Sequence, residues 1–433
     1  MSNKKVLIVT YYWPPAGGPG VQRWLKFVKY LPKFDIEPIV YCPENPNYPL
    51  VDTALMEDIS KEVTIIKQPI LEPYKIAALF SKKKTQTITS GIISTKKQSF
   101  IEKLLLYIRG NFFIPDARKF WIAPSIKFLA SYITEHQIST IITTGPPHSM
   151  HLIGLQLKKQ LGVNWVADFR DPWTTIGYHQ KMKLTSKSQL KHKKLEKEVL
   201  QSADEIIVTS PTTKQEFELI TNKPISVITN GFDDITLGKV ALDTKFTLSH
   251  IGSLLTGRNP EVLWSVLAEL IQEYEGFKHA FELKLIGAVS DDVLISIKNY
   301  GLDKHLSLLG YVTHKEAQVQ QRQSQLLLLV EIDSPETRCI IPGKLFEYMQ
   351  SNRPILAFGP EKTDFKAIIA STNTGTTFNY HQTEKEAIKT TVLSYFKAYQ
   401  DNALNVNGIG IQKYHRKNLT EQLALILRPF LKP

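Results

Sequence analysis

The chain has 433 residues, 42% hydrophobic and 22% charged, a composition ordinary for a globular protein and a length that suggests two domains. The chain contains no run of eighteen apolar residues, so no membrane-spanning helix is expected. Its two cysteines, Cys42 and Cys339, lie far apart in the sequence, so no disulfide framework is expected. The formal net charge of +12 belongs to the first half: residues 1–230 hold 31 Lys and Arg against 19 Asp and Glu, and residues 231–433 hold 22 of each.

In the first half, short apolar runs alternate with helical patterns. The chain enters the first run without a signal peptide, which predicts a reduced, cytosolic protein. Residues 81–100 are rich in Lys, Ser, Thr and Gln and predict a mobile surface loop. The runs that predict strands are residues 6–10, 38–41, 63–67, 140–144, 165–169 and 205–209.

The second half repeats this alternation, which is typical of parallel sheets covered on both faces. We therefore predict an α/β protein with two doubly wound domains, residues 1–230 and 246–410, joined by a linker at residues 231–245. A final segment, residues 411–433, contains an amphipathic helix that we expect to pack back across the domain junction. The predicted strands of this half are residues 246–250, 281–286, 306–309, 325–330 and 354–358.

A glycine-rich turn with Gly17 and Gly18 follows the first predicted strand. Glycines at this edge of an open sheet let the backbone approach a ligand closely. The spacing is not that of the dinucleotide fingerprint, and a tight connection that needs glycine is the structural alternative. The position at the carboxyl edge of the sheet favours ligand binding.

Polar residues follow two more strands of the first half. His148 can be a general base, a phosphate partner or a structural loop histidine. Asp168, Arg170 and Asp171 lie at the end of an apolar strand, where charges are costly unless they pair or contact a ligand. An ion network among these three residues is the structural alternative, and it is compatible with substrate contact.

In the second half, Gly252, Ser253 and Arg258 follow the strand at residues 246–250. The glycine allows a close approach of the backbone, and the guanidinium group can clamp a phosphate with two hydrogen bonds. A surface arginine ahead of a helix is the structural alternative.

Residues 341–358 predict a loop, a helix that opens at Gly343 and Lys344, and a buried strand. A helix N-terminus and a lysine together favour a phosphate. Glu347 lies one turn further on the same face as Lys344, so a diphosphate and a ribose could be bound together. An ordinary helix start, capped by its own glutamate, is the alternative.

Taken together, these residues resemble family 4 of the retaining, nucleotide-sugar-dependent glycosyltransferases, which have the GT-B fold. The resemblance covers essentially the whole chain. It implies two Rossmann-like domains facing each other across a deep cleft, the second binding the nucleotide sugar and the first the acceptor. The motifs that carry it are Gly17-Gly18 and residues 203–210, 229–233, 252–258 and 342–357.

The resemblance also implies roles for single residues. The glutamate that matches Glu347 typically holds the ribose hydroxyls, and the basic residue that matches Arg258 typically touches the diphosphate. The donor-binding residues are expected to be Gly17, Gly18, Gly252, Ser253, Arg258, Gly343, Lys344, Leu345 and Glu347. The expected catalytic residues are Arg258, Lys344, His148 and Asp168, and the expected acceptor-binding residues are His148, Arg170 and Asp171.

The chain departs from the family pattern at two positions. Cys339 stands where the first glutamate of Glu-x7-Glu contacts the transferred sugar, so that role is empty or falls to Glu336 or another neighbour. Ser253 stands where the phosphate loop commonly carries a basic residue. The identity of the sugar is therefore open.

The sequence patterns Pro-Gly-Lys-Leu-Phe-Glu-Tyr and Asp-Phe-Arg-Asp-Pro-Trp resemble a subgroup in bacterial surface-polysaccharide assembly. The resemblance implies transfer from a nucleotide sugar to a glycan or a lipid-diphosphate-linked acceptor, with retention of configuration by same-face attack. The chain has no Asp-x-Asp metal motif, so we expect no metal or other cofactor, with cations and amide dipoles stabilising the leaving diphosphate. A double displacement through Asp168 or His148 is the weaker alternative.

The basic first half predicts peripheral docking to an anionic membrane. The lysines at 82–84, 96–97 and 181–197 and the anchors Tyr107, Phe112 and Phe113 would carry it. We expect no nucleic-acid partner despite the pI near 9.3, because no recognition-helix, zinc or aromatic-platform motif occurs. Alternative functions are a nucleotide-sugar epimerase or hydrolase of the same fold and a non-catalytic nucleotide-sugar-binding protein.

Overall fold

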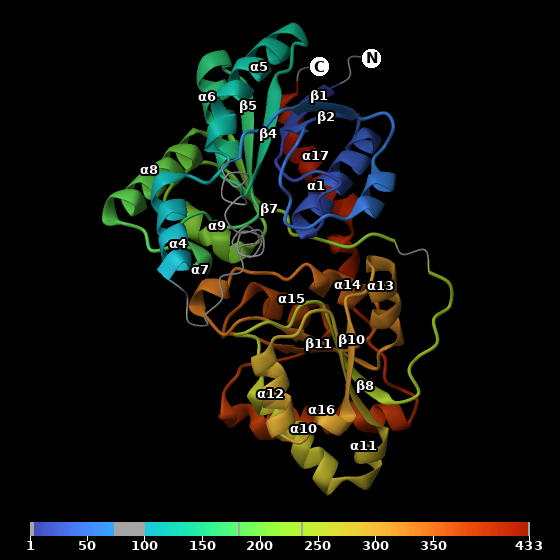
Figure 1. Ribbon diagram of the computed structural model, residues 1–433. Coiled ribbons are helices and arrows are strands. Elements are labelled where there is room, and N and C mark those ends of the chain that lie inside the picture. Colours follow the sequence, from blue (N-terminus) through green and yellow to red (C-terminus); the bar gives the residue numbers. More distant parts are fainter. Residues whose placement is uncertain (1–3, 73–99, 181, 235–236, 432–433) are drawn as a thin grey trace. The chain divides into compact units, whose positions relative to one another are not determined.

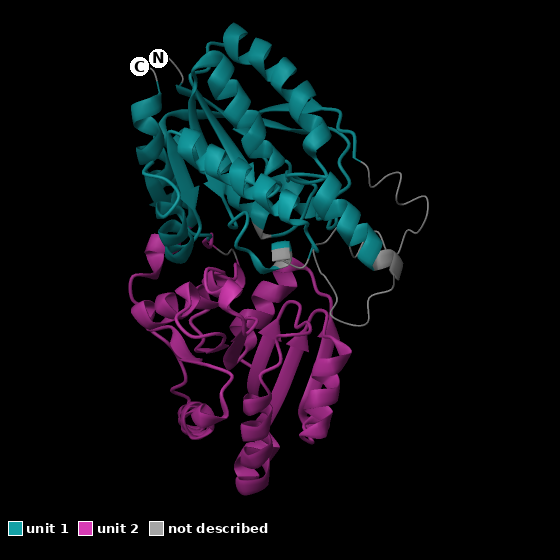
Figure 2. Cartoon of the chain, turned by 90° about the vertical axis from the view of Figure 1, so that its left-hand side faces the viewer, with its two compact units in different colours: residues 1–230, 416–433 teal, residues 231–415 magenta. Residues whose placement is uncertain are grey.

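The computed structural model describes residues 4–72, 100–180, 182–234 and 237–431. The loop predicted at residues 81–100 lies outside these ranges, except for its last residue, which begins a helix. The chain divides into two compact units, drawn in different colours in Figure 2: unit 1 comprises residues 1–230 and 416–433, and unit 2 comprises residues 231–415. Among the described residues, no helix is both long and apolar enough to cross a membrane.

Unit 1 is built on a seven-stranded parallel sheet with the order β3-β2-β1-β4-β5-β6-β7 (Figure 1). Successive side chains of a strand point to opposite faces of the sheet, and here both faces are apolar. In β1, Leu7 and Val9 join one hydrophobic core, whereas Val6 and Ile8 join the other. The strands are β1 (Lys4–Val9), β2 (Ile36–Pro43), β3 (Thr64–Gln68), β4 (Thr140–Gly145), β5 (Asn164–Phe169), β6 (Glu205–Val208) and β7 (Ile225–Val227).

Helices cover both faces of this sheet, as continuous apolar strands require. The helix α17 returns from unit 2 to unit 1, where Leu419, Leu423 and Leu427 are buried in the same core as Trp24 of α1. The helices of unit 1 are α1 (Pro19–Tyr30), α4 (Phe100–Phe112), α5 (Ile122–Glu135), α6 (Ser149–Leu161), α7 (Gly177–Gln180), α8 (Ser186–Ser202), α9 (Pro211–Glu218) and α17 (Arg416–Leu427).

Unit 2 repeats the architecture with a six-stranded parallel sheet of order β10-β9-β8-β11-β12-β13. In β11, Leu326 and Leu328 lie in one core and Leu327 and Leu329 in the other. The strands are β8 (Phe246–Ile251), β9 (Phe281–Ile286), β10 (Leu306–Gly310), β11 (Leu326–Val330), β12 (Ile355–Phe358) and β13 (Gly375–Phe378). The helices are α10 (Glu261–Glu273), α11 (Glu275–Ala280), α12 (Asp291–Asn299), α13 (His314–Gln323), α14 (Lys344–Gln350), α15 (Asp364–Thr372) and α16 (Lys385–Gln400).

Two parallel sheets covered by helices confirm the predicted α/β class with two doubly wound domains. The segment predicted as a linker, residues 231–245, is grouped with unit 2. Asp243 shows why: its carboxylate accepts hydrogen bonds of 2.8 Å from Lys284 Nζ and from Thr247 Oγ1. These bonds fix the end of the segment to the sheet of unit 2.

Candidate functional site

The carboxyl ends of the central strands β8 and β11 bring together most of the residues of unit 2 that the sequence analysis predicts to bind the donor. These strands are neighbours in the sheet, and they are followed directly by Gly252 and Glu331. Helix α14 begins at Lys344, as predicted, and its side chain reaches the loop after β8. Ligands of open α/β sheets bind at this edge, so the position alone marks a candidate site.

Lys344 lies against the backbone of Gly252. A Cβ atom added to Gly252 would lie 2.6 Å from Lys344 Nζ, closer than two such atoms can approach. Gly252 also has a φ of +118°, a conformation that favours glycine. Glycine is therefore needed both for the turn and for the amino group to come this close to the main chain.

The imidazole ring of His250 also contacts the amino group of Lys344. Its Nδ1 lies 3.0 Å from the carbonyl oxygen of Leu328, and its Nε2 lies 3.2 Å from Lys344 Nζ. A carbonyl only accepts, so Nδ1 carries the proton and Nε2 accepts from Lys344. Burial and the nearby Lys344 keep the pKa of His250 well below its usual value, which keeps the ring neutral.

The site also lowers the pKa of Lys344, to about 8. Desolvation by burial is the main cause, and the charge of Arg258 adds to it, while Glu331 and Glu347 act in the opposite direction. An anion bound beside the amino group would reverse this effect, because it favours the protonated form. A bound anion would therefore stabilise the charged form of Lys344 and raise its pKa.

Arg258 is held in place by Glu331. The guanidinium donates to Glu331 Oε1 from Nη2 at 2.9 Å and from Nε at 3.3 Å. The carboxylate is almost fully buried, with 3% of its side chain exposed, whereas 27% of the Arg258 side chain is exposed. The buried carboxylate therefore orients the guanidinium group, and the exposed part of the arginine side chain remains accessible to a ligand.

Glu347 is oriented by two side chains of α13. Its Oε1 lies 3.0 Å from His314 Nε2, and its Oε2 accepts a 3.0 Å hydrogen bond from Gln321. The N-terminus of α13 is fixed by a capping box between Thr313 and Glu316. These contacts fix the orientation of the Glu347 carboxylate, and 18% of the Glu347 side chain is exposed to solvent.

The other residues of unit 2 that are predicted to bind the donor contribute less to this sheet edge. Ser253 is exposed, and Leu345 is buried in the core, so it can contact a ligand only through its main chain. Helix α14 has seven residues, so its dipole is short and the positive charge of the site rests on side chains. Cys339 is buried with its Sγ 3.9 Å from the carbonyl oxygen of Glu336, whose carboxylate accepts a hydrogen bond from Ser334.

In unit 1, the glycine-rich turn after β1 makes packing contacts that require glycine, in addition to lying at the carboxyl edge of the sheet. Gly17 donates its N–H to Leu50 at 3.0 Å, and a Cβ atom there would lie 3.0 Å from the Leu50 side chain. Gly18 has a φ of +101° and precedes α1. A Cβ atom on Gly20 would meet Arg170 Nη1, so this glycine leaves room for the arginine. The need for glycine in the turn is thus partly one of packing.

Asp168 is fully buried, and all of its described contacts are internal. It accepts hydrogen bonds from Arg23 and Trp24 of α1, both at 2.8 Å, and from Thr144 at 2.7 Å. Arg23, which is itself buried, holds the pKa of this carboxyl below its usual range against the opposing effect of burial. Asp168 therefore ties α1 to the sheet, and this geometry favours a structural role over attack on a sugar.

Arg170 has no described hydrogen bond or ion pair with Asp168, so the ion network named above as the structural alternative is not seen between these two residues. Its guanidinium donates instead to the main-chain carbonyl groups of Gly145 and Pro146 and lies over the ring of Tyr12. The ion pair of Asp168 is formed with Arg23 from a distant helix, whereas Asp168 and Asp171 act on Arg170 only through their charge. Burial raises the pKa of Asp171, and Arg170 acts in the opposite direction.

His148 lines a cavity of about 190 Å³ in unit 1. Its ring stacks on Trp173, with the centroids 4.6 Å apart and the planes at 2°. His179 and His192 line the same cavity, together with Arg109 and Arg118. The structure thus brings His148 next to basic residues that the sequence analysis did not select.

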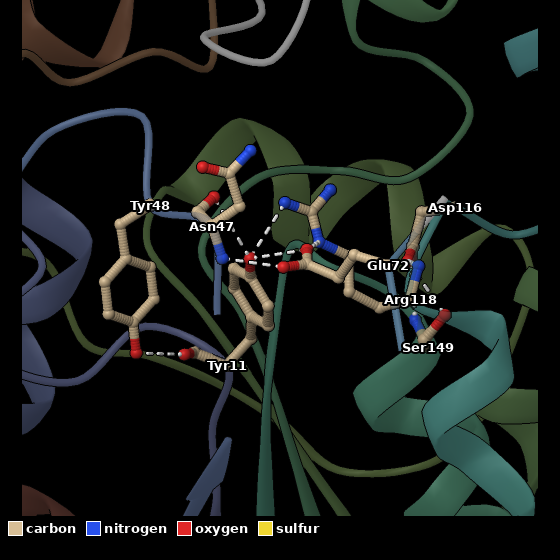
Figure 3. A network of polar contacts seen from close by, with 7 residues as sticks. All are labelled: Tyr11, Asn47, Tyr48, Glu72, Asp116, Arg118 and Ser149. Carbon is tan, nitrogen blue, oxygen red and sulfur yellow. Dashed lines mark hydrogen bonds and ion pairs between the residues drawn. The ribbon is translucent and has the colours of Figure 1, made fainter. Parts of the chain in front are cut away.

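Arg118 is fixed by the polar network of Figure 3. Its Nε lies 3.3 Å from the buried Glu72, and its Nη2 donates to Tyr11 Oη at 3.1 Å. Tyr11 in turn donates to Glu72 at 2.8 Å. Next to it, Asp116 accepts hydrogen bonds of 2.8 Å from the main-chain N–H and the hydroxyl of Ser149.

Sequence reasoning missed several residues that shape these sites. Glu331 was recognisable as a carboxylate directly after a continuous apolar strand, and His250 lies two residues ahead of the glycine of the loop. No comparable signal marked Arg118, His179 or His192, which lie far apart in sequence and meet only through the fold.

Comparisons with known proteins agree with this architecture. Residues 92–234 match the model of Glycosyltransferase Family 4, which confirms the resemblance read from the motifs. No curated protein matches the chain. Together, the family model and the fold support a glycosyltransferase.

Solved structures similar to the whole chain share its GT-B fold at low identity. A glycosyltransferase from Rickettsia africae is 15% identical, with 100% of both chains covered and a TM-score of 0.59. Anabaena Alr3699/HepE in complex with UDP is 14% identical, with 98% of this chain and 100% of that chain covered and a TM-score of 0.61. WaaG, a glycosyltransferase involved in lipopolysaccharide biosynthesis, is 13% identical, with 97% and 99% covered and a TM-score of 0.54.

Proposed function

We propose that the protein transfers a sugar from a nucleoside-diphosphate sugar to an acceptor, with unit 2 binding the donor. The observation that carries this proposal is Lys344, a half-buried cation whose amino group lies 3.2 Å from Nε2 of neutral His250 and close to the backbone of Gly252. Arg258 supplies a second cation at the same sheet edge. HepE, whose fold is similar, has been solved with UDP and with UDP-glucose, which supports a nucleotide sugar as the donor.

In this proposal, the diphosphate lies against Lys344 and Arg258, and Glu347 accepts hydrogen bonds from the ribose hydroxyls. Departure of the nucleoside diphosphate builds negative charge on its oxygens, and preorganised cations stabilise that charge. A metal ion is not required for this step. The acceptor attacks the same face of the sugar while the leaving diphosphate assists its deprotonation, so the anomeric configuration is retained.

A panel of nucleotide sugars tests the donor site. A donor that binds the folded chain at a hundred times its Kd stabilises the fold by about 2.7 kcal/mol, which a thermal-shift assay detects. We expect one donor to raise the Tm of the wild type and to raise that of Lys344→Met far less. No shift with any donor would contradict the proposed donor site.

Measurement of nucleoside-diphosphate release with and without acceptors then tests transfer. Release that depends on an acceptor supports a transferase. Donor consumption at the same rate without an acceptor would support a hydrolase or an epimerase instead. Binding without turnover across acceptors would indicate a non-catalytic protein.

We further propose that the acceptor is a glycan or a lipid-linked oligosaccharide in surface-polysaccharide synthesis and that unit 1 docks to an anionic membrane from the cytoplasmic side. WaaG, named for lipopolysaccharide biosynthesis, supports the first part through its similar fold. The second part is supported by exposed Lys187, Lys191 and Lys194 on one side of α8. Each such lysine contributes roughly 1 kcal/mol near an anionic surface.

Helix α4, whose end is hydrogen-bonded to the segment before α8, carries exposed apolar side chains that could anchor the protein in a membrane. Its exposed Leu104, Tyr107, Ile108 and Phe112 recur every three to four residues, so they lie along one side of the helix. Phe112 has 63% of its surface exposed, whereas Phe113 is only partly exposed and packs against Phe120.

Co-sedimentation with vesicles tests the membrane proposal. We expect binding to vesicles that contain anionic lipid, little binding to neutral ones, and a steep loss between 50 mM and 300 mM salt. Changing Lys187, Lys191 and Lys194 to Gln should weaken binding, whereas the matched triple change of the exposed Lys298, Lys304 and Lys315 in unit 2 should not. Equal, negligible binding to both vesicle types would refute the docking while leaving the transfer reaction untouched.

A further inference from the structure

The cavity of unit 1 contains buried polar groups that have no partner. Within the described part of the chain, neither ring nitrogen of His148 accepts or donates a hydrogen bond, and neither does Nε2 of His179. Both residues are more than nine-tenths buried, with exposed fractions of 5% and 7%. Buried polar atoms without partners are costly, so they indicate a ligand or water that completes their hydrogen bonds.

The cavity is large enough for such a ligand. Its volume of about 190 Å³ is far above the roughly 15 Å³ that one water molecule needs. Arg118 and Arg109 bring two guanidinium groups to its lining, and Arg118 is held by Glu72 and Tyr11. These are the side chains that proteins use for phosphate groups.

The one acidic residue of the described lining, Asp116, is already engaged. Its carboxylate accepts hydrogen bonds from Ser149 N, Ser149 Oγ and the main-chain N–H of Arg118, each at 2.8 Å. It therefore fixes the loop that carries Arg118 and the start of α6. None of the described hydrogen bonds of Asp116 goes to a guanidinium group of the lining, and the guanidinium group of Arg118 is oriented by Glu72 instead.

The electrostatics of the histidines favour an anion over a neutral ligand. Burial lowers the pKa of His148 well below its usual value and the pKa of His179 to about 4, and the neighbouring histidines and Arg170 add to the shift of His148. A negative charge in the cavity would oppose these effects and draw protons onto the rings. Among the described residues, the charged and titratable groups that line the cavity or act on His148 are Tyr12, Arg109, Asp116, Arg118, His151, Arg170 and His192.

The cavity adjoins the apolar side of α4. Arg109 and Gly110 of this helix line the cavity, and exposed Ile108 and Phe112 lie next to them in the helix. The end of α4 is joined to the segment before α8 by Asn111, which accepts from the N–H of Thr185 at 2.8 Å. An anion site thus lies beside exposed apolar side chains and the lysines of α8.

We propose that this cavity binds the diphosphate of a lipid-linked acceptor, whose hydrocarbon chain leaves along the exposed side of α4. The proposal rests on the glycosyl transfer proposed above and decides between its two acceptor classes. A free glycan offers neither the negative charge nor the apolar chain that these two neighbouring surfaces match. A bound diphosphate would give His148 and His179 their missing hydrogen-bond partners.

The test uses the full chain and three probes in titration calorimetry: farnesyl diphosphate, inorganic pyrophosphate and farnesol. We expect farnesyl diphosphate to bind at least tenfold more tightly than either of the others, because it alone offers both charge and chain. Binding of pyrophosphate with equal affinity would overturn the lipid source, and binding of farnesol with equal affinity would overturn the anion site.

Matched variants locate the binding. Arg109→Gln, on a partly exposed side chain, and the double variant Arg109→Gln/His179→Gln should weaken farnesyl diphosphate binding about tenfold or more. Lys344→Met in unit 2 should leave it unchanged. The reverse pattern would show that the probe occupies the proposed donor site and would overturn the proposal. A thermal melt checks that each variant is folded, and Arg109→Gln serves alone if the double variant is not.

Proton uptake separates a ligand contact from a structural role. Binding enthalpies measured at pH 7 in two buffers of different ionisation enthalpy should show protons taken up by the wild type, and fewer by the double variant. No uptake would contradict the involvement of the histidines. The variants should keep their affinity for UDP, so loss of lipid-diphosphate binding with UDP binding intact refutes this inference alone, whereas absence of UDP binding refutes the proposed function.

Discussion

The affinity for UDP should fall as the pH rises through the pKa of Lys344. The free protein has this pKa at about 8, because burial disfavours the ammonium form. The protonated fraction is then about 0.9 at pH 7 and about 0.1 at pH 9. Only the cation attracts the diphosphate, and the apparent Kd equals the intrinsic Kd divided by the competent fraction. The Kd of UDP should therefore rise about tenfold between pH 7 and pH 9, as measured by titration calorimetry.

The other groups around Lys344 should not produce this slope. They are His250, Arg258, Glu331 and Glu347. The lowered pKa keeps His250 neutral between pH 7 and pH 9. Lys344→Met should bind UDP weakly and with a flat pH profile, whereas the exposed Lys278→Met should retain the wild-type slope. A flat profile in the wild type would refute the assignment of Lys344 to the diphosphate.

Four further outcomes follow from the contacts described above. Glu347→Ala should weaken donor binding tenfold to a hundredfold, since a hydrogen bond to a charged group contributes about 1.5–3 kcal/mol; calorimetry that shows unchanged affinity would remove the ribose assignment. Arg258→Ala should lower turnover at saturating donor on the order of tenfold to a thousandfold, and normal turnover would place the diphosphate elsewhere. EDTA should leave turnover intact, and a loss restored by magnesium or manganese would contradict the metal-free mechanism. Asp168→Asn should cost about 3–5 kcal/mol in urea unfolding because Arg23 loses its buried partner, whereas Glu198→Gln in an exposed pair should cost less than about 1 kcal/mol; a small effect of Asp168→Asn would contradict its structural role.

The sequence predicted the central strands of both sheets well because strands such as β4 and β11 are buried on both faces. Every predicted apolar run overlaps an observed strand, and the run at residues 281–286 coincides with β9. The strands that were not predicted, β7 and β13, lie at sheet edges. β7 has three residues, and three of the four residues of β13 are partly exposed, so neither gives the continuous apolar pattern that marks a central strand.

The candidate sites were predictable only where one segment carries several of their residues. Lys344 and Glu347 are three residues apart, and a helix start is a local signal. The partner of Asp168 was not predictable in the same way, because Arg23 is 145 residues away and competes with the adjacent Arg170. Pairing between distant charges depends on how α1 packs on the sheet, which no local pattern encodes.

The charges of unit 2 differ in a way that bears on function. Arg258 and Lys344 lie at the same sheet edge, but Arg258 has a buried carboxylate partner in Glu331, whereas the described hydrogen bond of Lys344 goes to neutral His250. Removing part of the water shell of a half-buried cation is costly, and the lowered pKa of Lys344 reflects that cost. An anionic ligand offsets the cost only while it is bound. In the proposed donor site, we therefore expect Arg258, paired with Glu331, to orient the ligand, and Lys344, hydrogen-bonded to His250, to make binding sensitive to the charge of the ligand.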